Sequence, residues 1–503
     1  MKFRFIITIP VILIILSFES GSFAQDNNRT LNNGIKDIYS FRMKEANAFF
    51  SAFINSNPSD PRGYYFLASL HLWKYLGNSN SSDLEQFIEL ADRSIAKCDK
   101  LISEENTLAD ALYFRGSMYG YKSIAYGKAE KYLEMIWASK NCTSDLNDVL
   151  KINPNYFDAY LGLGLFKFAL SQVPSSFKWA LNMIGFEGDM NQGLAMIRKT
   201  AVKGKLAKVE AQFYLAQILT DYYQSYTEST ALLKDLTNKY PGNLLFQYSY
   251  AVINIKKRDL KPAEKNLKSI VENKDKSFSQ IGSFSYFLLG DVNYFRNDYD
   301  QAIRNYNSFL ASTTSREYSG IASLRIALSY EMTGDSFAAK RYYEKIVKSN
   351  WSNEEDLYAK RKSIQYLKRR PSQSELEVLK FQNMLEAGRY SVIIDSLPGI
   401  IEKIPSGYVR GTAALVLSDA AFNSGNYKEA FDYALSAVQS NSESESWIVP
   451  YGNYYAAKAL YQSGNKVRAY EFLEKAEDIR EYDFISRLKP LLAHLRNKFS
   501  EQS

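Results

Sequence analysis

The 503-residue sequence is poor in the residues that most often carry enzyme chemistry. It has only two histidines, His71 and His494, and two cysteines, Cys98 and Cys142. The histidines lie near opposite ends of the chain, and no cysteine pair has the spacing of a zinc motif. No P-loop occurs, and the Gly-x-Gly at Gly162 lacks the preceding strand of a dinucleotide-binding fold. The sequence therefore predicts no enzyme, metal site or cofactor, although a carboxylate site formed only in the folded chain stays open.

Strand patterns and long apolar runs are also scarce. Few stretches alternate apolar and polar residues over strand length, which argues against a sheet-based fold. One long apolar run, residues 5–18, follows the basic residues Lys2 and Arg4 and is short for a bilayer span. Because the Ser-Phe-Ala sequence at 22–24 is typical of a cleavage site, residues 1–24 are expected to be a signal peptide. The protein is then exported, either periplasmic or secreted; an uncleaved anchor and association with the outer membrane stay open.

Export permits a disulfide between Cys98 and Cys142, but the predicted geometry disfavours one. If both cysteines lie on second helices of neighbouring repeats, they are offset by about seven residues, or roughly 10 Å of helical rise. The Cα atoms of a disulfide lie within roughly 7 Å of each other. Two buried free thiols are therefore expected.

The chain has, in contrast, a recurrent spacing of twelve between small residues that lie in apolar-periodic helical stretches. A short polar turn separates the two members of each pair. The pairs are Ala251/Ala263, Gly290/Ala302, Ala327/Ala339, Ser418/Ala430 and Ala457/Ala469. Antiparallel helices that cross closely need small residues at the crossing, so the repeated pairs predict a helical solenoid.

These repeats resemble the tetratricopeptide repeat, a unit of about 34 residues whose two helices meet at small residues. The stretch 286–309 has aromatic and small residues in the order that this repeat uses. Proline ends three helical runs, at Pro58, Pro154 and Pro241. The resemblance implies an all-α, right-handed solenoid of antiparallel helix pairs with one non-repeat helical insert.

Repeats and interruptions divide the chain into predicted segments. Residues 39–57 are interpreted as the second helix of an incomplete first unit, and residues 482–498 as a terminal helix that covers the last apolar face. The segments are a signal peptide (1–24), N-terminal helical repeats (25–154), an atypical helical segment (155–203), central repeats (204–350), a charged connector (351–372), and C-terminal repeats with a capping helix (373–503).

The atypical segment carries a second resemblance. It contains Gly-Leu-Gly at 162–164, Leu-Ser-x-x-Pro at 170–174, Gly-Phe-x-Gly-Asp at 185–189 and Gly-Leu at 193–194. This order and spacing are similar to a tetratricopeptide family that comprises fungal inclusion-body-clearance proteins, animal tetratricopeptide-39 proteins and bacterial relatives.

The residues of this segment also have a structural interpretation. Gly162 and Gly164 allow close backbone approach, Gly185 and Gly188 allow positive φ, and Asp189 can cap the next helix. The apolar stretch 177–184 then forms a wedge helix packed on the solenoid. The alternative is a surface for a partner or a membrane interface that includes Trp179.

The formal net charge is +7, and much of the basic character lies at 360–362 and 368–370. One interpretation is a solvated helix face. The other is a surface for lipid headgroups, polysaccharide or an acidic partner. The residues that would carry it are Lys360, Arg361, Arg369 and Arg370. Nucleic acid is not an expected partner of an exported chain.

The function that the repeats favour is that of a non-enzymatic scaffold in the bacterial cell envelope. It would bind a protein or peptide through its concave face, with exposed aromatic residues on first helices, for example Tyr286, Tyr294 and Tyr330. The alternatives are a binding module for an anionic envelope lipid or polysaccharide, and an enzyme of the helical-toroid type. The sequence does not identify the partner.

Overall fold

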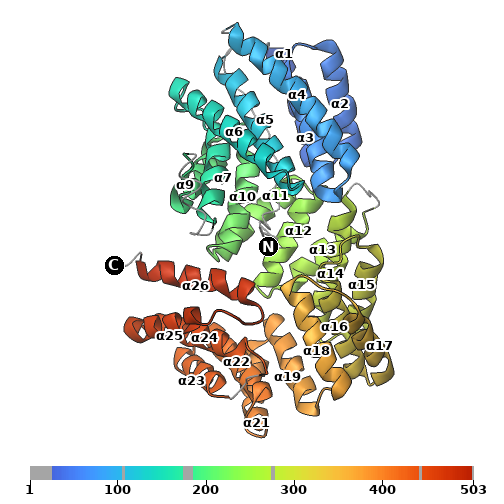
Figure 1. The fold of residues 1–503 in the computed structure, drawn as a ribbon, viewed down its shortest axis with the longest axis vertical. Coiled ribbons are helices and arrows are strands. Elements are labelled where there is room, and N and C mark those ends of the chain that lie inside the picture. Colours follow the sequence, from blue (N-terminus) through green and yellow to red (C-terminus); the bar gives the residue numbers. More distant parts are fainter. Residues whose placement is uncertain (1–24, 105–107, 174–184, 274–277, 441–443, 501–503) are drawn as a thin grey trace. The chain divides into compact units, whose positions relative to one another are not determined.

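A computed structural model of the chain is helical throughout the residues that it describes, without strands among them (Figure 1). These are residues 25–104, 108–173, 185–273, 278–440 and 444–500. The predicted signal peptide and Trp179 lie outside these ranges. None of the described helices combines the length and apolar character needed to cross a membrane.

The chain folds into two compact units. Unit 1 comprises Met1–Thr220, Ser225–Tyr250 and Asp275–Ser279, and unit 2 comprises Asp221–Gln224, Ala251–Lys274 and Gln280–Ser503. Helix α12 (Leu244–Lys256) begins in unit 1 and ends in unit 2.

Unit 1 consists of helices, of which each one up to Lys203 packs against its neighbour in the chain. They are α1 (Gln25–Tyr39), α2 (Met43–Ser56), α3 (Pro61–Asn78), α4 (Ser81–Ser103), α5 (Leu108–Lys128), α6 (Tyr132–Ile152), α7 (Ala159–Ser171), α9 (Met190–Lys203), α10 (Lys208–Asp221), α11 (Tyr226–Lys239) and the start of α12. The interpretation of an incomplete first unit is wrong, because α1 precedes α2. Helix α1 buries Leu31, Ile35 and Ile38, so the first repeat has both of its helices.

Unit 2 continues the antiparallel pairs. Its helices are the end of α12, α13 (Leu260–Val271), α14 (Ser279–Phe295), α15 (Tyr299–Ser312), α16 (Ser319–Thr333), α17 (Ser336–Lys348), α18 (Glu354–Lys368), α19 (Gln373–Glu386), α20 (Tyr390–Ser396), α21 (Pro398–Ile401), α22 (Tyr408–Asn423), α23 (Tyr427–Val438), α24 (Ile448–Gln462), α25 (Lys466–Asp478) and α26 (Ile485–Ser500). In α26, Leu488, Leu492 and Leu495 are buried against the preceding pair, which confirms the predicted terminal cap.

The twelve-residue spacing marks helix crossings, as predicted. All ten small residues of the five pairs are buried. At Gly290 a Cβ would lie 2.5 Å from the ring of Tyr306, and the Ser418 hydroxyl donates to the carbonyl oxygen of Ala430 at 2.7 Å. Each intervening turn contains a residue in the left-handed conformation: Arg258, Asn297, Gly334, Gly425 and Gly464. Two helices joined by so short a turn must run antiparallel and touch, so side chains larger than these do not fit.

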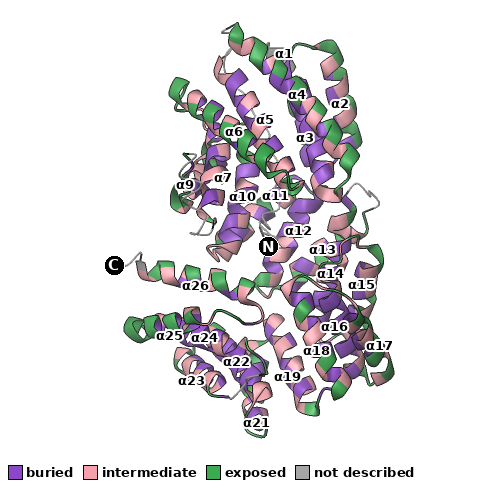
Figure 2. Cartoon of the chain, viewed as in Figure 1, coloured by how far each residue is buried: buried purple, intermediate pink, exposed green. Residues whose placement is uncertain are grey.

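Helix ends and burial follow the repeat as well. Helices α2, α6 and α11 each end two residues before a proline, at Pro58, Pro154 and Pro241. Helix α16 is buried on nearly all sides, whereas α17, the second helix of the same pair, buries one stripe (Figure 2). Every residue from Gly411 to Ala421 in α22 is buried. First helices of this kind therefore have helices on both sides and form an inner layer.

Helices α7 and α9, in the atypical segment, cross at glycines. A Cβ on Gly164 would lie 2.8 Å from the carbonyl oxygen of Gly193, and a Cβ on Gly193 would lie 2.7 Å from that of Gly164. A Cβ on Gly162 would lie 2.5 Å from the side chain of Leu146. The predicted close backbone approach is therefore confirmed at Gly164, whereas Gly162 makes room for a side chain.

The turn before α9 is explained in part by the sequence. Asp189 accepts a hydrogen bond from the backbone N–H of Gln192 at 2.9 Å, so it caps α9 as predicted. Gly185 has a φ of 77°. The expectation of positive φ at Gly188 is wrong: Gly188 is required for space, because a Cβ there would lie 2.3 Å from the backbone nitrogen of Ser171.

The two cysteines, Cys98 in α4 and Cys142 in α6, are free and buried, as expected. Burial raises the pKa of both thiols, to about 12 for Cys142. Neither thiol is therefore activated as a nucleophile at neutral pH.

Candidate functional site

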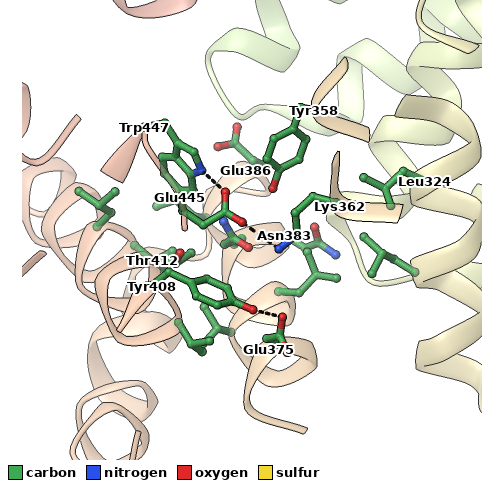
Figure 3. A pocket seen from close by; sticks show the side chains of 18 of the residues that line it. Leu324, Tyr358, Lys362, Glu375, Asn383, Glu386, Tyr408, Thr412, Glu445 and Trp447 are labelled. Carbon is green, nitrogen blue, oxygen red and sulfur yellow. Dashed lines mark hydrogen bonds and ion pairs between the residues drawn. The ribbon is translucent and has the colours of Figure 1, made fainter. Parts of the chain in front are cut away.

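Unit 2 contains a cavity of about 350 Å³ on its inner layer of first helices. Residues of α14, α16, α18, α19, α22 and α24 line it, together with Phe484 and Arg487. The lining is rich in aromatic side chains, which are Tyr294, Phe295, Tyr358, Tyr366, Tyr408, Trp447, Tyr451, Tyr455 and Phe484. Figure 3 shows several of these rings, from different helices, around one space. A concave, mainly apolar site with a few polar groups is the usual form of a ligand pocket.

Glu445 is the most buried charge in the lining, with 2% of the residue exposed. Lys362 donates to it at 2.8 Å and the indole N–H of Trp447 at 3.0 Å (Figure 3). Arg361, which is outside the lining, also donates to it at 2.8 Å. Burial by itself raises the pKa of Glu445, but the charges and hydrogen bonds of Lys362 and Arg361 outweigh it and lower the pKa. Glu445 is therefore ionised at neutral pH and neutralised by its neighbours.

Glu375 forms a second paired site in the lining. Arg369 donates to its carboxylate at 2.6 Å, the backbone N–H of Ser372 donates at 2.8 Å, and Tyr408 also donates to it (Figure 3). Burial opposes ionisation, yet these bonds lower the pKa of Glu375 to about 2. Burial and the neighbouring carboxylate raise the pKa of Tyr408 to about 12. Tyr408 therefore stays protonated as a donor at neutral pH.

The other charged groups of the lining are paired too. Arg325 binds Asp291, Glu386 binds Arg258 at 3.4 Å, and Arg487 binds Glu355 at 3.0 Å. The lining holds three cations (Arg325, Lys362 and Arg487) and three carboxylates (Glu375, Glu386 and Glu445). Its formal charge is therefore zero.

Tyr294 differs from these paired groups. The residue is 3% exposed and lines the cavity, and its hydroxyl has no hydrogen-bond partner among the described residues. Burial raises its pKa, so the hydroxyl stays protonated. A buried hydroxyl without a partner costs free energy.

Residues 483–487, which we name the closing segment, join the start of α26 to α18. Glu354 accepts hydrogen bonds from the backbone N–H of Ile485 at 2.6 Å and of Ser486 at 3.3 Å. Arg361 binds Asp483 at 2.7 Å, and the rings of Phe484 and Tyr358 lie 4.6 Å apart. Contacts across more than 120 residues of sequence thus place Phe484 and Arg487 beside the cavity.

The three tyrosines predicted to be exposed have different positions. Tyr294 is buried, so the expectation of exposure is wrong for it, although it lines the cavity. Tyr286 and Tyr330 are half-buried against the core of α14 to α17 and are not among the lining residues. The structure therefore brings one of the three to the candidate site.

The four basic residues that the sequence suggested for an anionic partner each have a partner within the chain. Arg361, Arg369 and Arg370 bind Glu445, Glu375 and Glu331, and Lys360 donates to the carbonyl oxygen of Ser349 at 3.1 Å. The segment expected as a connector contains α18, where Lys362 is 4% exposed. The expectation of a solvated face is wrong at Lys362, because this lysine pairs with a buried carboxylate.

Most of the lining residues were missed from the sequence. Periodicity identifies residues as buried but does not separate a packed core from a cavity wall. Spacing gave a partial signal: Tyr358 and Tyr366 lie eight residues apart on α18, and Tyr451 and Tyr455 lie four apart on α24, so each pair shares a helix face. No group of three or more His, Cys, Asp or Glu residues in the described ranges has the arrangement of a metal site.

Part of the chain matches the model of a known protein family. Residues 157–387 match the model of the family Iml2/Tetratricopeptide repeat protein 39, a range that includes α7 and α9 and ends in the residue after α19. The match thus contains the glycine crossing and part of the cavity lining.

Several solved structures are also similar to the chain. The TPR domain of P58(IPK) has a TM-score of 0.23 and 13% identity, over 88% of this chain and 99% of that chain. A human IFIT1 dimer with m7Gppp-AAAA has a TM-score of 0.35 and 15% identity, over 83% and 95%. Yeast Tom70 has a TM-score of 0.23 and 12% identity, over 95% and 97%. With TM-scores below 0.5, the fold assignment rests on the helices themselves.

Proposed function

We propose that this chain, a tetratricopeptide-repeat protein of the Iml2/Tetratricopeptide repeat protein 39 type, is a non-enzymatic scaffold that binds a protein partner through the cavity of unit 2. The observation that carries the proposal is the position of the cavity on the inner layer of first helices. Repeat arrays of this kind offer a concave surface assembled from successive units.

The paired charges of the lining support a binding role over a catalytic one. A general acid or base needs a pKa near the working pH, as a rule through a carboxylate or histidine without a fixed counter-ion. Glu375 and Glu445 are instead held ionised by cations. Tight ion pairs fix the walls of a binding site but leave no group ready for proton transfer.

We also propose that the protein acts outside the cytoplasm of a bacterial cell. The support is the sequence pattern of residues 1–24, with two basic residues, an apolar run and a small-x-small site before Gln25. Cell fractionation followed by mass analysis of the purified protein tests this. A chain that begins at Gln25 in an envelope or culture fraction is the expected result, and a cytoplasmic chain with intact residues 1–24 would contradict it.

Cross-linking in the native host, followed by mass spectrometry, tests the binding site. Gln382 lines the cavity from α19 and is half-buried, so Gln382→Trp should fill the cavity without disturbing the core. Lys466→Trp at the start of α25 is the matched control, since Lys466 is exposed and is not among the lining residues. We expect the cross-linked partner to be lost with Gln382→Trp and kept with Lys466→Trp. An unchanged partner set in folded Gln382→Trp protein would refute the proposed site.

A further inference from the structure

A group of lysine side chains lies at one edge of unit 1, where α9 ends and α10 begins. From Met190 to Val209 the sequence has five basic residues and no acidic one. Four of the five are lysines, which we name the basic edge: Lys199, Lys203, Lys205 and Lys208. All are exposed except Lys199, which is half-buried. The basic edge therefore presents its charge to solvent.

Contacts with the loop before α7 bring these lysines together. The ammonium groups of Lys199 and Lys203 lie 5.5 and 5.3 Å from the centre of the Phe157 ring. The next residue, Asp158, accepts a hydrogen bond from the backbone N–H of Lys205 at 2.9 Å. Two adjacent residues thus hold the end of α9 and the turn after it, so the cations of the basic edge share one surface.

Most of these lysines do not balance a charge within the fold. The neighbouring Arg198 pairs with Glu228. In contrast, Lys199, Lys203 and Lys208 form no ion pair with a carboxylate of the described residues. Their charges are therefore available to a negatively charged partner.

Helix stability does not explain the whole basic edge. A cation in the last turn of a helix is favourable, so Lys203, the last residue of α9, has a structural role. Lys208 is the first residue of α10, where the positive end of the helix dipole disfavours a cation. A bound anionic partner would offset this repulsion.

The residue types favour a lipid surface over a protein. Protein interfaces are depleted in lysine, and a fixed carboxylate is bound best by the planar fork of arginine. Lysine is a flexible point charge, which suits the fluid headgroups of an anionic membrane. Val202 shares a face of α9 with Lys199 and Lys203 and is 65% exposed. Apolar side chains next to cations are typical of helices that lie on a membrane.

We propose that the basic edge of unit 1 binds the anionic headgroups of a lipid membrane, with Val202 entering the interface between headgroups and acyl chains. This goes beyond the proposed function, because the site lies on unit 1 and does not involve the cavity of unit 2. It holds the scaffold on a membrane surface and leaves the cavity to the partner.

Sedimentation with lipid vesicles, using the protein purified from its native host, tests the charge requirement. We expect binding to an equal mixture of phosphatidylglycerol and phosphatidylcholine, and weaker binding in high salt, which screens exposed charges. Each lysine near a membrane contributes about fivefold to affinity, so Lys203→Gln/Lys205→Gln/Lys208→Gln should weaken binding about 100-fold. Equally tight binding to phosphatidylcholine alone would overturn the proposal.

Lys44→Gln/Lys140→Gln/Lys234→Gln is the matched control. It removes the same charge from three exposed lysines of α2, α6 and α11 in unit 1, outside the basic edge. The control should bind vesicles as the wild type does, and both triple variants should keep the wild-type melting temperature, because only exposed side chains change. A folded triple variant of the basic edge that binds as tightly as this control would overturn the proposal.

A fluorescent label on α9 distinguishes lipid from another anionic polymer. Val202→Cys, coupled to an environment-sensitive fluorophore, should shift its emission to the blue on the mixed vesicles. Val467→Cys on α25, where Val467 is 75% exposed, is the control and should show no shift. The native Cys98 and Cys142 are buried and should stay unlabelled. Vesicle binding without a shift at Val202→Cys, or binding of dextran sulfate as tight as that of the vesicles, would overturn the assignment to lipid.

Discussion

Each unit buries a glutamate side chain, and the two glutamates differ in whether cations lie beside the carboxylate. In unit 1, Glu210 is 2% exposed and one of its carboxylate oxygens has no partner among the described residues, so burial raises its pKa. In unit 2, Glu445 is equally buried but pairs with Lys362 and Arg361. Removing water from a carboxylate favours its neutral form unless cations are close. The pairing in unit 2 keeps charge inside the fold, where it holds separate elements together.

Glu445→Gln should destabilise unit 2 strongly at neutral pH. The substitution leaves Lys362 buried without its counter-ion, and breaking a buried pair in this way costs about 3–5 kcal/mol. The folded-state pKa of Glu445 is lowered, so its contribution is present at neutral pH and is lost as the pH falls through that value. Urea unfolding of both proteins at neutral and acidic pH measures the difference, which should shrink in acid.

Glu429→Gln is the control for this prediction. Glu429 is exposed on α23, and its substitution should change stability by less than about 0.5 kcal/mol. A Glu445→Gln protein as stable as this control at neutral pH would contradict the importance of the pair.

Asp158 in unit 1 should produce the opposite pH dependence. Its carboxylate accepts from the backbone N–H groups of Lys205 and Ala207, at 2.9 and 2.7 Å, and so joins the two ends of the α7–α9 segment. Burial outweighs these bonds and raises the pKa of Asp158 to about 6. Its contribution to stability is thus full below the ordinary value and is lost as the pH rises through about 6.

The comparison of wild type with Asp158→Asn measures this effect. The wild-type advantage should be larger at pH 4 than at pH 7.5, by up to about 3 kcal/mol, because one pKa unit corresponds to about 1.4 kcal/mol. The urea midpoint of unit 1, followed across this pH range, is the measurement. An advantage that does not change with pH would show that Asp158 is not desolvated in solution.

At the scale of elements, helix pairs are defined by how closely their backbones approach. Within α14, Gly290 faces the ring of Tyr306, whereas a Cβ on Gly282 would have nothing within 4 Å. The same residue type in the same helix therefore has two roles. One glycine makes room for a crossing, and the other only weakens the helix, since glycine is a poor helix former.

Gly290→Ala and Gly282→Ala should change stability in opposite directions. Gly290→Ala forces a methyl group against Tyr306 and should destabilise unit 2 by about 1–3 kcal/mol. Gly282→Ala removes backbone entropy from the unfolded chain and should stabilise by about 0.5–1 kcal/mol. Thermal unfolding followed by circular dichroism measures both. Equal effects of the two substitutions would refute the assignment of Gly290 to a crossing.

The helix pairs could be predicted from the sequence because their requirement is local and repeated. A small residue such as Ala327 recurs twelve positions later as Ala339, and both are buried at the crossing. The cavity could not be predicted in this way. Helix α18 has a polar sequence, and its lysine at 362 is buried only because Glu445 lies beside it in the fold. Such a partner, 83 residues away, leaves no periodic signal.

At the largest scale, each unit depends on contacts between residues far apart in the chain. In unit 1, the amide of Asn243 donates to the carbonyl oxygen of Tyr39 at 2.9 Å, across 204 residues. In unit 2, the closing segment binds α18 across more than 120 residues. A simple solenoid has contacts only between neighbouring repeats. These additional contacts make each unit more cooperative than the repeat pattern alone predicts.

Local opening of the closing segment should depend more than that of any other part of unit 2 on one hydrogen-bond acceptor, the carboxylate of Glu354. Glu354→Ala removes the carboxylate that binds the N–H groups of Ile485 and Ser486, while the core leucines of α26 stay packed. Hydrogen exchange at 485–486 should become faster, by roughly tenfold, because the loss of such bonds lowers the free energy of local opening. Exchange in the middle of α22 should not change.

Glu317→Ala, at an exposed position before α16, is the control and should leave exchange at 485–486 unchanged. The same variants connect this motion to binding, because Phe484 and Arg487 of the closing segment line the cavity. If the segment holds these side chains in place, Glu354→Ala should weaken capture of the cross-linked partner while Glu317→Ala does not. Faster exchange with unchanged partner capture would show that the closing segment stabilises unit 2 without shaping its cavity, and unchanged exchange would show that Glu354 does not hold it.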